Sequence, residues 1–233
     1  MVLDYDLQID GLKASLMGIE DVMDVTEFLL DYFFSEEPLG KALGLDVEAE
    51  VRPWLAEVVR HQVQENTSIV IRSSASDNQL VAVCLNDVER NIDDAGDVTI
   101  STSVNEKYHP AMWKITRLLM DLVKDVDLFD RFHINAYVLL EILCVHPRYA
   151  GRGLAGKMID ITGRIARESG HSLIISEATS GYSSSAFLKA GYTIENSIDY
   201  ADYSLDGISK PFASRTGVHT GARLMIKQLD PLT

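Results

Sequence analysis

The feature that most constrains the fold of this chain is an apolar run that leads through a glycine-rich loop into a helix pattern. The run Tyr137–Val145 (YVLLEILCV) is almost continuously apolar, which is typical of a strand covered on both faces of a sheet. In the following segment, Gly151–Ser169, apolar residues recur at helical spacing: Leu154, Met158, Ile161 and Ile165. A buried strand followed by an amphipathic helix predicts an α/β or α+β layered fold.

Periodic segments on both sides of this unit predict further elements. Helical spacing is found in Glu20–Phe34, Asp46–Gln64, Trp113–Val123 and Ser183–Lys189,. Strand patterns are found in Ser68–Arg72, Leu80–Leu85, Leu173–Ser176, Tyr192–Ile198 and Arg223–Leu229,. We expect Ser73–Asn78 to be a hairpin connection and the turn-rich segment Asn91–Pro110 to be irregular. Since no linker interrupts this order, the sequence predicts one domain over residues 1–233,.

Composition and charge exclude several classes of function. A hydrophobic fraction of 46% and a charged fraction of 24% are ordinary for a globular protein,. The net charge of −14 argues against nucleic acid or an anionic membrane as the main partner,. No apolar run is long enough to span a membrane, and the first residues lack the pattern of a secretory signal,. Cys84 and Cys144 form neither a disulfide framework nor a zinc spacing, so we expect a cytoplasmic setting and no metal.

The loop after the apolar run allows more than one interpretation. Gly151, Gly153 and Gly156 match G-x-G-x-x-G, and Glu177 follows at about the distance of a ribose-binding acid,. A dinucleotide-dependent oxidoreductase is therefore one alternative, and a plain structural turn is another. Against the first, His146–Ala150 separate the strand from the first glycine, whereas dinucleotide folds turn directly off the strand. Backbone N–H groups at such a helix start favour an anion such as pyrophosphate.

The same loop resembles the acetyl-CoA-binding motif of the GNAT superfamily of N-acetyltransferases. The match is V-x-P-x-Y-x-G-x-G-L-A from Val145 to Ala155, followed by Lys189-x-Gly191-Tyr192. This resemblance implies a central mixed, twisted sheet flanked by helices, with acetyl-CoA as co-substrate. Ala150 stands where the superfamily usually has Arg or Gln, so Arg148 or Arg152 would supply positive charge there.

A narrower resemblance covers most of the chain. FFSEEPLG (residues 33–40), SGYSSS (180–185), YADY (200–203), Lys210-Pro211 and His219-x-Gly221 occur in the order found in insect-type arylalkylamine N-acetyltransferases. That group contains dopamine and agmatine N-acetyltransferases. The resemblance implies acetyl transfer to the primary amine of a small molecule, an arylalkylamine or a related biogenic amine. It does not specify the amine or the oligomeric state. A non-catalytic acyl-CoA-binding domain is a further alternative.

Attack of an amine on a thioester requires proton removal and stabilisation of the oxyanion and the leaving thiolate. The resemblance implies that Glu37 is the general base, acting through water. It also places hydroxyl groups at Ser183 and Thr179, whereas Phe187 stands where many GNAT enzymes have a tyrosine acid. The alternative for this serine-rich segment is that Ser180 or Ser183 only caps a helix.

The remaining candidate site residues fall into two groups. Cofactor binding falls to Leu143, Cys144, Val145, Arg148, Ala150, Gly151, Arg152, Gly153, Leu154, Ala155 and Ser180. Backbone N–H groups around Leu143–Val145 would bind the pantetheine arm and the thioester carbonyl. For amine binding, the resemblance suggests His219, with a structural hydrogen bond as the alternative. The residues themselves suggest Glu36 for the ammonium group, and Phe33 and Tyr203 as pocket walls or, alternatively, core residues. Covalent catalysis by Cys144 is disfavoured because no His–Asp partners are recognisable and a cysteine in a buried strand is usually inert.

Overall fold

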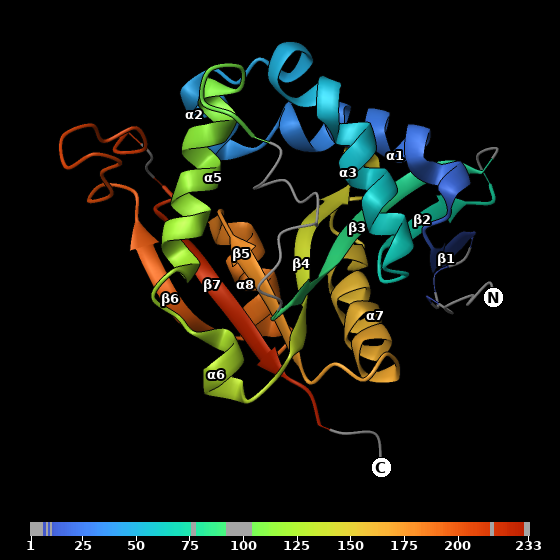
Figure 1. The fold of residues 1–233 in the computed structure, drawn as a ribbon. Helices are drawn as coiled ribbons and strands as arrows, with labels where there is room; N and C mark the ends of the chain where they lie inside the picture. Colours follow the sequence, from blue (N-terminus) through green and yellow to red (C-terminus); the bar gives the residue numbers. More distant parts are fainter. Residues whose placement is uncertain are drawn as a thin grey trace.

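The computed structural model describes residues 7, 9, 11–75, 78–91, 104–214 and 217–230. Its centre is a seven-stranded sheet in the order β1–β2–β3–β4–β5–β7–β6 (Figure 1). The strands are β1 (Leu12–Leu16), β2 (Ile69–Ser73), β3 (Gln79–Arg90), β4 (Ala136–Val145), β5 (Leu173–Ala178), β6 (Thr193–Asp199) and β7 (Gly221–Gln228). Only β4 and β5 pair in parallel, and the other neighbours are antiparallel. The mixed sheet is the one that the sequence predicts.

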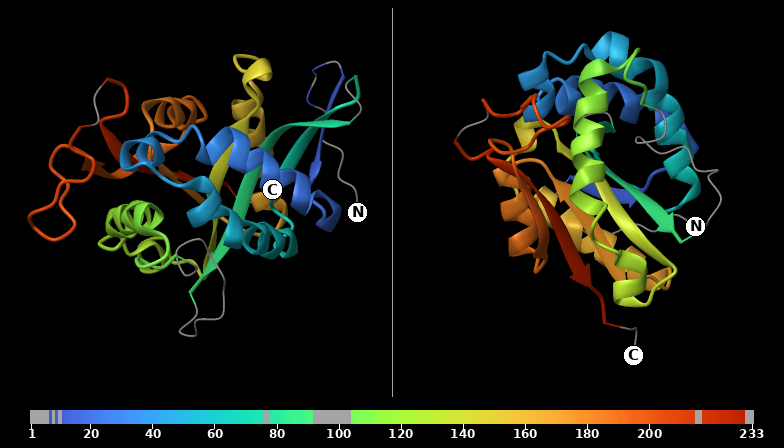
Figure 2. Two further views of the ribbon diagram at one scale, coloured as in Figure 1. Left: turned by 90° about the horizontal axis from the view of Figure 1, so that it is seen from above. Right: turned by 60° about the vertical axis from the view of Figure 1, so that its left-hand side comes forward.

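Helices cover both faces of the sheet (Figure 2). One face carries α1 (Val22–Leu29), α2 (Pro38–Leu43), α3 (Arg52–Gln64) and α5 (Pro110–Val123), and the other carries α7 (Leu154–Glu168) and α8 (Gly181–Lys189). The short helix α6 (Leu128–Phe132) precedes β4. Single turns of π-helix, Leu30–Phe34 and Val47–Val51, and of 3₁₀-helix, Ile19–Asp21 and Pro147–Tyr149, complete the described elements. None of the helices in the described ranges is long and apolar enough to cross a membrane.

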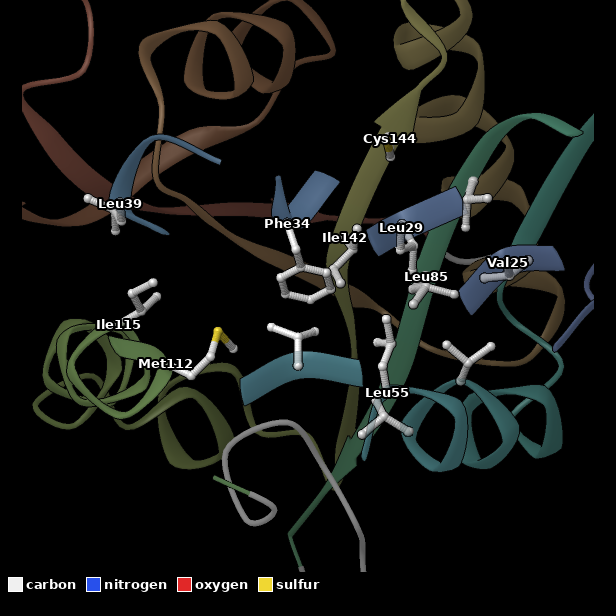
Figure 3. Packing of buried hydrophobic residues seen from close by; sticks show 14 of the residues in the cluster. Val25, Leu29, Phe34, Leu39, Leu55, Leu85, Met112, Ile115, Ile142 and Cys144 are labelled. Atoms are coloured by element: carbon white, nitrogen blue, oxygen red, sulfur yellow. The ribbon is translucent and has the colours of Figure 1, made fainter. Parts of the chain in front are cut away.

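Two apolar clusters hold the layers together, one on each face of the sheet. The predicted stripe Leu154, Met158, Ile161 and Ile165 is buried in the α7 cluster, which confirms the helix assignment. The opposite cluster joins α1, α3 and α5 to β3 and β4. In Figure 3, Phe34 reaches towards Ile142 of β4, and Met112 and Ile115 of α5 lie beside it. Within the predicted helix Glu20–Phe34, Met23 faces solvent and is 61% exposed.

Several elements differ from the sequence prediction. Strand β1 and helix α2 were not predicted, and the predicted helix Glu20–Phe34 ends in a π-helical turn. Strand β3 continues to Arg90 instead of ending at Leu85, because buried Asn86 is stabilised by hydrogen bonds to Thr67 and Thr162. The predicted irregular segment lies partly outside the described residues, and its last residue, Pro110, begins α5.

A bulge and a divergence of strands create the site. On β3, Leu85 pairs with Ile142 and Asn86 with Leu140, so Glu141 has no partner residue there. A β-bulge of this kind re-aims a side chain and is frequent beside active sites. The β4–β5 ladder consists of Val138–Ile174 and Leu139–Ile175. Beyond these pairs the two strands separate, and the backbone of β4 towards Val145 is open on its β5 side.

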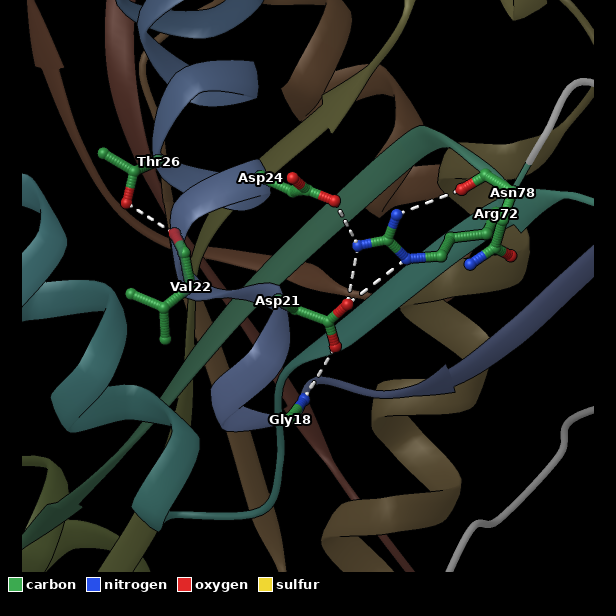
Figure 4. A network of polar contacts seen from close by, with 7 residues as sticks. All are labelled: Gly18, Asp21, Val22, Asp24, Thr26, Arg72 and Asn78. Carbon is green, nitrogen blue, oxygen red and sulfur yellow. Dashed lines mark hydrogen bonds and ion pairs between the residues drawn. The ribbon is translucent and has the colours of Figure 1, made fainter.

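A buried polar network fixes the start of α1 to the sheet (Figure 4). The Arg72 guanidinium on β2 donates to Asp21 at 2.7 Å and to Asp24 at 2.9 Å. Asp21 also accepts from the backbone N–H of Gly18 at 2.8 Å. Because α1 leads directly into the π-helical turn and α2, this anchor helps to place Phe33 and Glu37 over the ends of β4 and β5.

Candidate active site

A pocket opens where β4 and β5 separate, beneath the π-helical turn and beside α5. Its volume is about 100 Å³. Its walls are largely apolar and include Phe33, Phe34, Leu45, Met112, Ile115 and Ile142. Glu37, Glu141, Glu177 and Thr179 supply its principal polar groups. A concave apolar site with a few convergent polar groups is the usual form of a small-molecule site.

Glu37 is held in the pocket by the local helix start and by β5. It is the N-cap of α2, and Pro38 occupies the first helical position, where a missing N–H costs nothing. One carboxylate oxygen accepts from the Gly40 N–H at 2.6 Å, and the other accepts from the Thr179 hydroxyl at 3.0 Å. Two of the three predicted catalytic residues, Glu37 and Thr179, are therefore in direct contact.

Tyr200, within the YADY motif, holds the backbone directly after β5. Its hydroxyl donates to the backbone carbonyl of Thr179 at 2.7 Å. Burial, and then the negative charge of Glu37, raises the pKa of Tyr200, so the phenol keeps its proton and remains a donor. The sequence analysis gave this residue no role of its own.

Ser183 and Ser180 form a reciprocal cap at the start of α8. The Ser183 N–H donates to Ser180 Oγ at 3.0 Å, and the Ser183 hydroxyl donates to the Ser180 carbonyl at 3.0 Å. This geometry is the capping alternative raised by the sequence; a catalytic role for Ser183 stays a prediction. Phe187 is 2% exposed and packs on Tyr192, so it contributes to the core.

The glycine loop presents backbone donors at the start of α7. The N–H groups of Arg148, Tyr149 and Ala150 are used inside the loop, bonding His146 and Pro147. By contrast, the N–H groups of Gly151, Arg152 and Gly153 have no acceptor within the described part of the chain. The first turn of α7 adds N–H groups that no helical carbonyl can accept from.

The space above this loop is open. Gly151 and Gly153 have φ values of +76° and +77°, and a Cβ at either would meet nothing within 4 Å. Arg148 and Arg152 are exposed, and the Arg152 guanidinium lies over the Tyr149 ring at 4.9 Å. Free donors, open space and flanking guanidinium groups fit a bound pyrophosphate.

Leu143, Cys144 and Val145 pair with β3 along one edge of β4, and their other edge faces the divergence from β5. Burial raises the pKa of the Cys144 thiol to about 12. The thiol therefore stays protonated, which agrees with a packing role rather than a nucleophilic one.

Of the predicted amine-binding residues, Phe33 lines the pocket and three others lie outside its lining. Glu36 is exposed and forms an ion pair with Lys41. Tyr203 donates to Asp121 at 2.8 Å. His219 packs edge-on to Tyr182, and its Nδ1 is buried without a hydrogen-bond partner in the described ranges.

The structure brings two further acids into the pocket, Glu141 and Glu177, which the sequence did not predict there. Burial, and then nearby Asp87 and Glu177, raises the pKa of Glu141 to about 8. Burial, and then Glu89, raises the pKa of Glu177 to about 7. Glu141 is a lone acid in an apolar strand. Because buried acids are rare unless they are paired or functional, this position was a signal in the sequence for a site residue. Glu177 had been considered only as a ribose ligand.

One trio of possible metal ligands also comes together, although no spacing in the sequence suggests it. Ligand atoms of His61, Glu65 and Asp87 lie within 4.8 Å of one another. Glu65 is already paired with Arg90 at 2.6 Å, so the trio does not by itself constitute a metal site.

Comparisons with known proteins agree with this architecture. No family model matches the sequence. The structure is similar to arylalkylamine N-acetyltransferase 2 from Aedes aegypti, with 25% identity, a TM-score of 0.84, and coverage of 95% of this chain and 100% of that chain. A Drosophila melanogaster polyamine N-acetyltransferase that forms N-acetylagmatine gives 20% identity and a TM-score of 0.75, covering 94% and 100%. A putative acetyltransferase from Salmonella typhimurium, solved with acetyl-CoA, gives 13% identity and a TM-score of 0.54, covering 95% of both chains.

Proposed function

We propose that this chain, which has the GNAT N-acetyltransferase fold of the insect arylalkylamine N-acetyltransferases, transfers an acetyl group from acetyl-CoA to the primary amine of a small molecule. The acceptor class that the resemblance favours is an arylalkylamine or a related biogenic amine. The pocket at the open ends of β4 and β5 would hold the acceptor, and the start of α7 would hold the acyl donor.

The observation that carries this proposal is the pair of hydrogen bonds that fix the Glu37 carboxylate inside the pocket. An alkylamine has a pKa of about 10.4 and arrives protonated at neutral pH. A protonated amine cannot attack a thioester, so a base must remove its proton. Glu37 is fixed where it can do so through an ordered water, and Thr179 is the side chain that orients it.

Donor binding is supported by the free N–H groups of Gly151, Arg152 and Gly153 and by the start of α7 at Leu154 and Ala155. These would bind the pyrophosphate of acetyl-CoA, with Arg148 and Arg152 adding charge. The small Ala150 leaves room beside the loop, and Ser180 lies at the start of the neighbouring helix α8. Acetyl-CoA supplies the activated acetyl group. The open edge at Leu143, Cys144 and Val145 offers backbone N–H groups to its pantetheine arm and carbonyl.

The thiolate-stabilising role falls to Ser183 and Thr179, because Phe187 has no proton to give. The apolar pocket walls, including Phe33, suit the carbon skeleton of the amine. The proposal that Glu36, Tyr203 and His219 bind the acceptor rests on the sequence alone, since each has another contact in the structure. Both described cysteines are free thiols, which supports work in the reducing cytoplasm.

The dinucleotide alternative is disfavoured by the topology. A doubly wound dinucleotide-binding fold needs a run of parallel strands, whereas β4 and β5 are the only parallel neighbours in the described sheet.

A direct assay tests the proposal. CoA release from acetyl-CoA would be measured over a panel of arylalkylamines, alkylamines and diamines, and binding of CoA and NADH would be compared by calorimetry. We expect turnover with at least one primary amine and binding of CoA but not NADH. CoA binding without turnover on any amine would favour a non-catalytic acyl-CoA-binding domain, and NADH binding alone would refute the proposal.

A further inference from the structure

A second acidic group lies in the pocket, separate from Glu37. Since Glu141 is the bulged residue of β4, it and the next residue, Ile142, both face the pocket. Glu177 of β5 lines the same pocket, and its negative charge acts on Glu141. The bulge on β4 and the end of β5 therefore bring two carboxyl groups from neighbouring strands to the same floor of the cavity.

This acid pair has no cationic partner. The Gln62 side chain donates a hydrogen bond to Glu141. No hydrogen bond or ion pair to Glu177 is found, and no lysine or arginine pairs with either acid, within the described ranges. Both residues are enclosed by protein, and the exposure they retain is towards the cavity. Buried carboxylates ordinarily pair with a cation or stay protonated.

The remaining groups around the pair are acidic or neutral. Asp87 and Glu89 on β3 act on Glu141 through their negative charge, and Glu89 and Glu177 act in the same way on Tyr137. Helix α5 contributes Met112, Ile115, Thr116 and Leu119 to the pocket, none of them charged. Within the described ranges, the pocket floor is thus an apolar space that holds two carboxyl groups and is lined by no lysine or arginine.

We propose that Glu141 and Glu177 bind a second cationic group of the acceptor, so that the preferred substrate is a diamine or a guanidino-amine rather than a simple monoamine. This inference rests on the proposed acetyltransferase function. Glu177 lies near the end of β5, and Thr179 follows directly after the last residue of that strand. Two residues of extended chain correspond to about 6.6 Å. A short aliphatic chain spans that distance, with its reacting amine near Glu37 and Thr179, its far cation at the acid pair and its methylene groups on the apolar walls.

Protonation supports this assignment and gives a second observable. With pKa values raised to about 8 for Glu141 and about 7 for Glu177, the empty pair retains protons near neutral pH. A cation requires the deprotonated pair, so binding of a diamine should release protons, and its KM should fall as pH rises from about 6 to about 8. Asp87, Glu89, Tyr137 and Gln62 are the groups around this equilibrium. A monoamine should release no protons from the pair.

The test compares 1,4-diaminobutane and agmatine with butylamine, 2-phenylethylamine and tyramine, in the wild-type protein and in Glu177→Gln. We expect the wild-type kcat/KM to be at least tenfold higher for the diamine than for butylamine. Glu177→Gln should remove most of that preference by raising KM for the diamine at least tenfold more than KM for butylamine. Glu141→Gln should act in the same direction, and Glu57→Gln, on the exposed face of α3, controls for a lost surface charge.

Equal or better use of butylamine, 2-phenylethylamine or tyramine by the wild type would overturn the inference while leaving the proposed function intact. A uniform loss of activity on all amines in Glu177→Gln would also overturn it, because it would indicate a role in proton transfer or folding. If no amine is acetylated, the proposed function fails. Thermal stabilisation by 1,4-diaminobutane then still tests whether the acid pair binds a dication. Stabilisation of the wild type but not of Glu177→Gln would support the acid pair as a dication site; equal stabilisation would refute it.

Discussion

At the scale of the single residue, Glu37 is a helix cap that we propose also acts as the base. The carboxylate caps α2 through Gly40 and accepts the Thr179 hydroxyl, so its position is set by two elements distant in sequence. Both carboxylate oxygens already accept one hydrogen bond, but each has a further lone pair. A water bound to one of these lone pairs would carry the proton of the amine to Glu37. A cap that also acts as a base is rigid, which favours a defined geometry for proton transfer.

Replacement of this acid tests the base directly. Glu37→Gln keeps the shape and removes the basicity, so we expect kcat/KM to fall by about 10²–10⁴-fold. Acetyl-CoA affinity should change little, and the rising limb of the pH–rate profile should move to higher pH as the reaction comes to depend on free amine. Glu57→Gln should behave as wild type. An unmoved profile with full activity would reduce Glu37 to a helix cap.

The serine pair at α8 separates capping from catalysis. Ser180→Ala removes the N-cap of α8 and should lower the free energy of unfolding by about 1 kcal/mol. Ser183→Ala leaves the N-cap hydroxyl in place, so it should destabilise the protein less. If Ser183 stabilises the leaving thiolate, kcat should nevertheless fall tenfold or more under conditions where chemistry limits the rate. Wild-type kcat in Ser183→Ala would leave water as the proton donor.

At the scale of the element, helix α7 has on its first turn the donor site that we propose, and its two ends offer a matched comparison. Gly153 precedes the helix with φ +77°, and Gly170 follows it with φ +82°. An added Cβ at either would meet nothing within 4 Å. The two glycines therefore share the same backbone strain but differ in whether a ligand is expected beside them.

We expect Gly153→Ala and Gly170→Ala each to destabilise the fold by roughly 1–2 kcal/mol, because a left-handed backbone disfavours a Cβ. Only Gly153→Ala should also weaken acetyl-CoA binding, by about tenfold, as the methyl group hinders close approach of the pyrophosphate. Calorimetric titration of both variants, with unfolding curves, separates the two effects. An equal change in affinity in both variants would contradict a donor site on this loop.

At the scale of the whole molecule, the acid pair couples the pocket to the stability of the fold. Glu141 and Glu177 have pKa values of about 8 and about 7 in the folded protein, above the ordinary 4.5. The folded state therefore holds these protons over a pH range in which the unfolded chain has lost them. Stability contributed by the protonated acids is present at low pH and declines as pH rises from about 4.5 towards 8,.

The expected result is a wild-type unfolding free energy that decreases between pH 5 and pH 8, with a slope of at most about 1.4 kcal/mol per pH unit for each acid. Glu177→Gln should flatten this slope. The unfolding free energy of the variant, relative to that of the wild type, should therefore be higher at pH 8 than at pH 5. Denaturant unfolding at both pH values measures the difference, with Glu57→Gln as the charge control. Parallel pH curves for all three proteins would show that the acid pair is not buried and protonated.

The sequence by itself determined the layers and the donor loop, because both depend on local patterns. The apolar run at Tyr137–Val145 and the stripe from Leu154 to Ile165 require burial on particular faces, and this predicted the sandwiched sheet. The glycine loop owes its donors to its position at a helix start. Glu37 was identified only through a resemblance of motifs, since a loop acid beside Glu36 carries no local signature.

Only the tertiary structure decided which side chains line the pocket. The Glu37–Thr179 hydrogen bond joins residues far apart in the chain, and no periodicity encodes such a contact. Glu141 faces the pocket because one bulge shifts the alternation of β4, and Glu177 reaches the same pocket from β5. Register and bulges arise from pairing between strands, so a single strand's sequence leaves them undetermined. We propose that these acids select the substrate. Their position in the pocket depends on how the strands pair in the sheet.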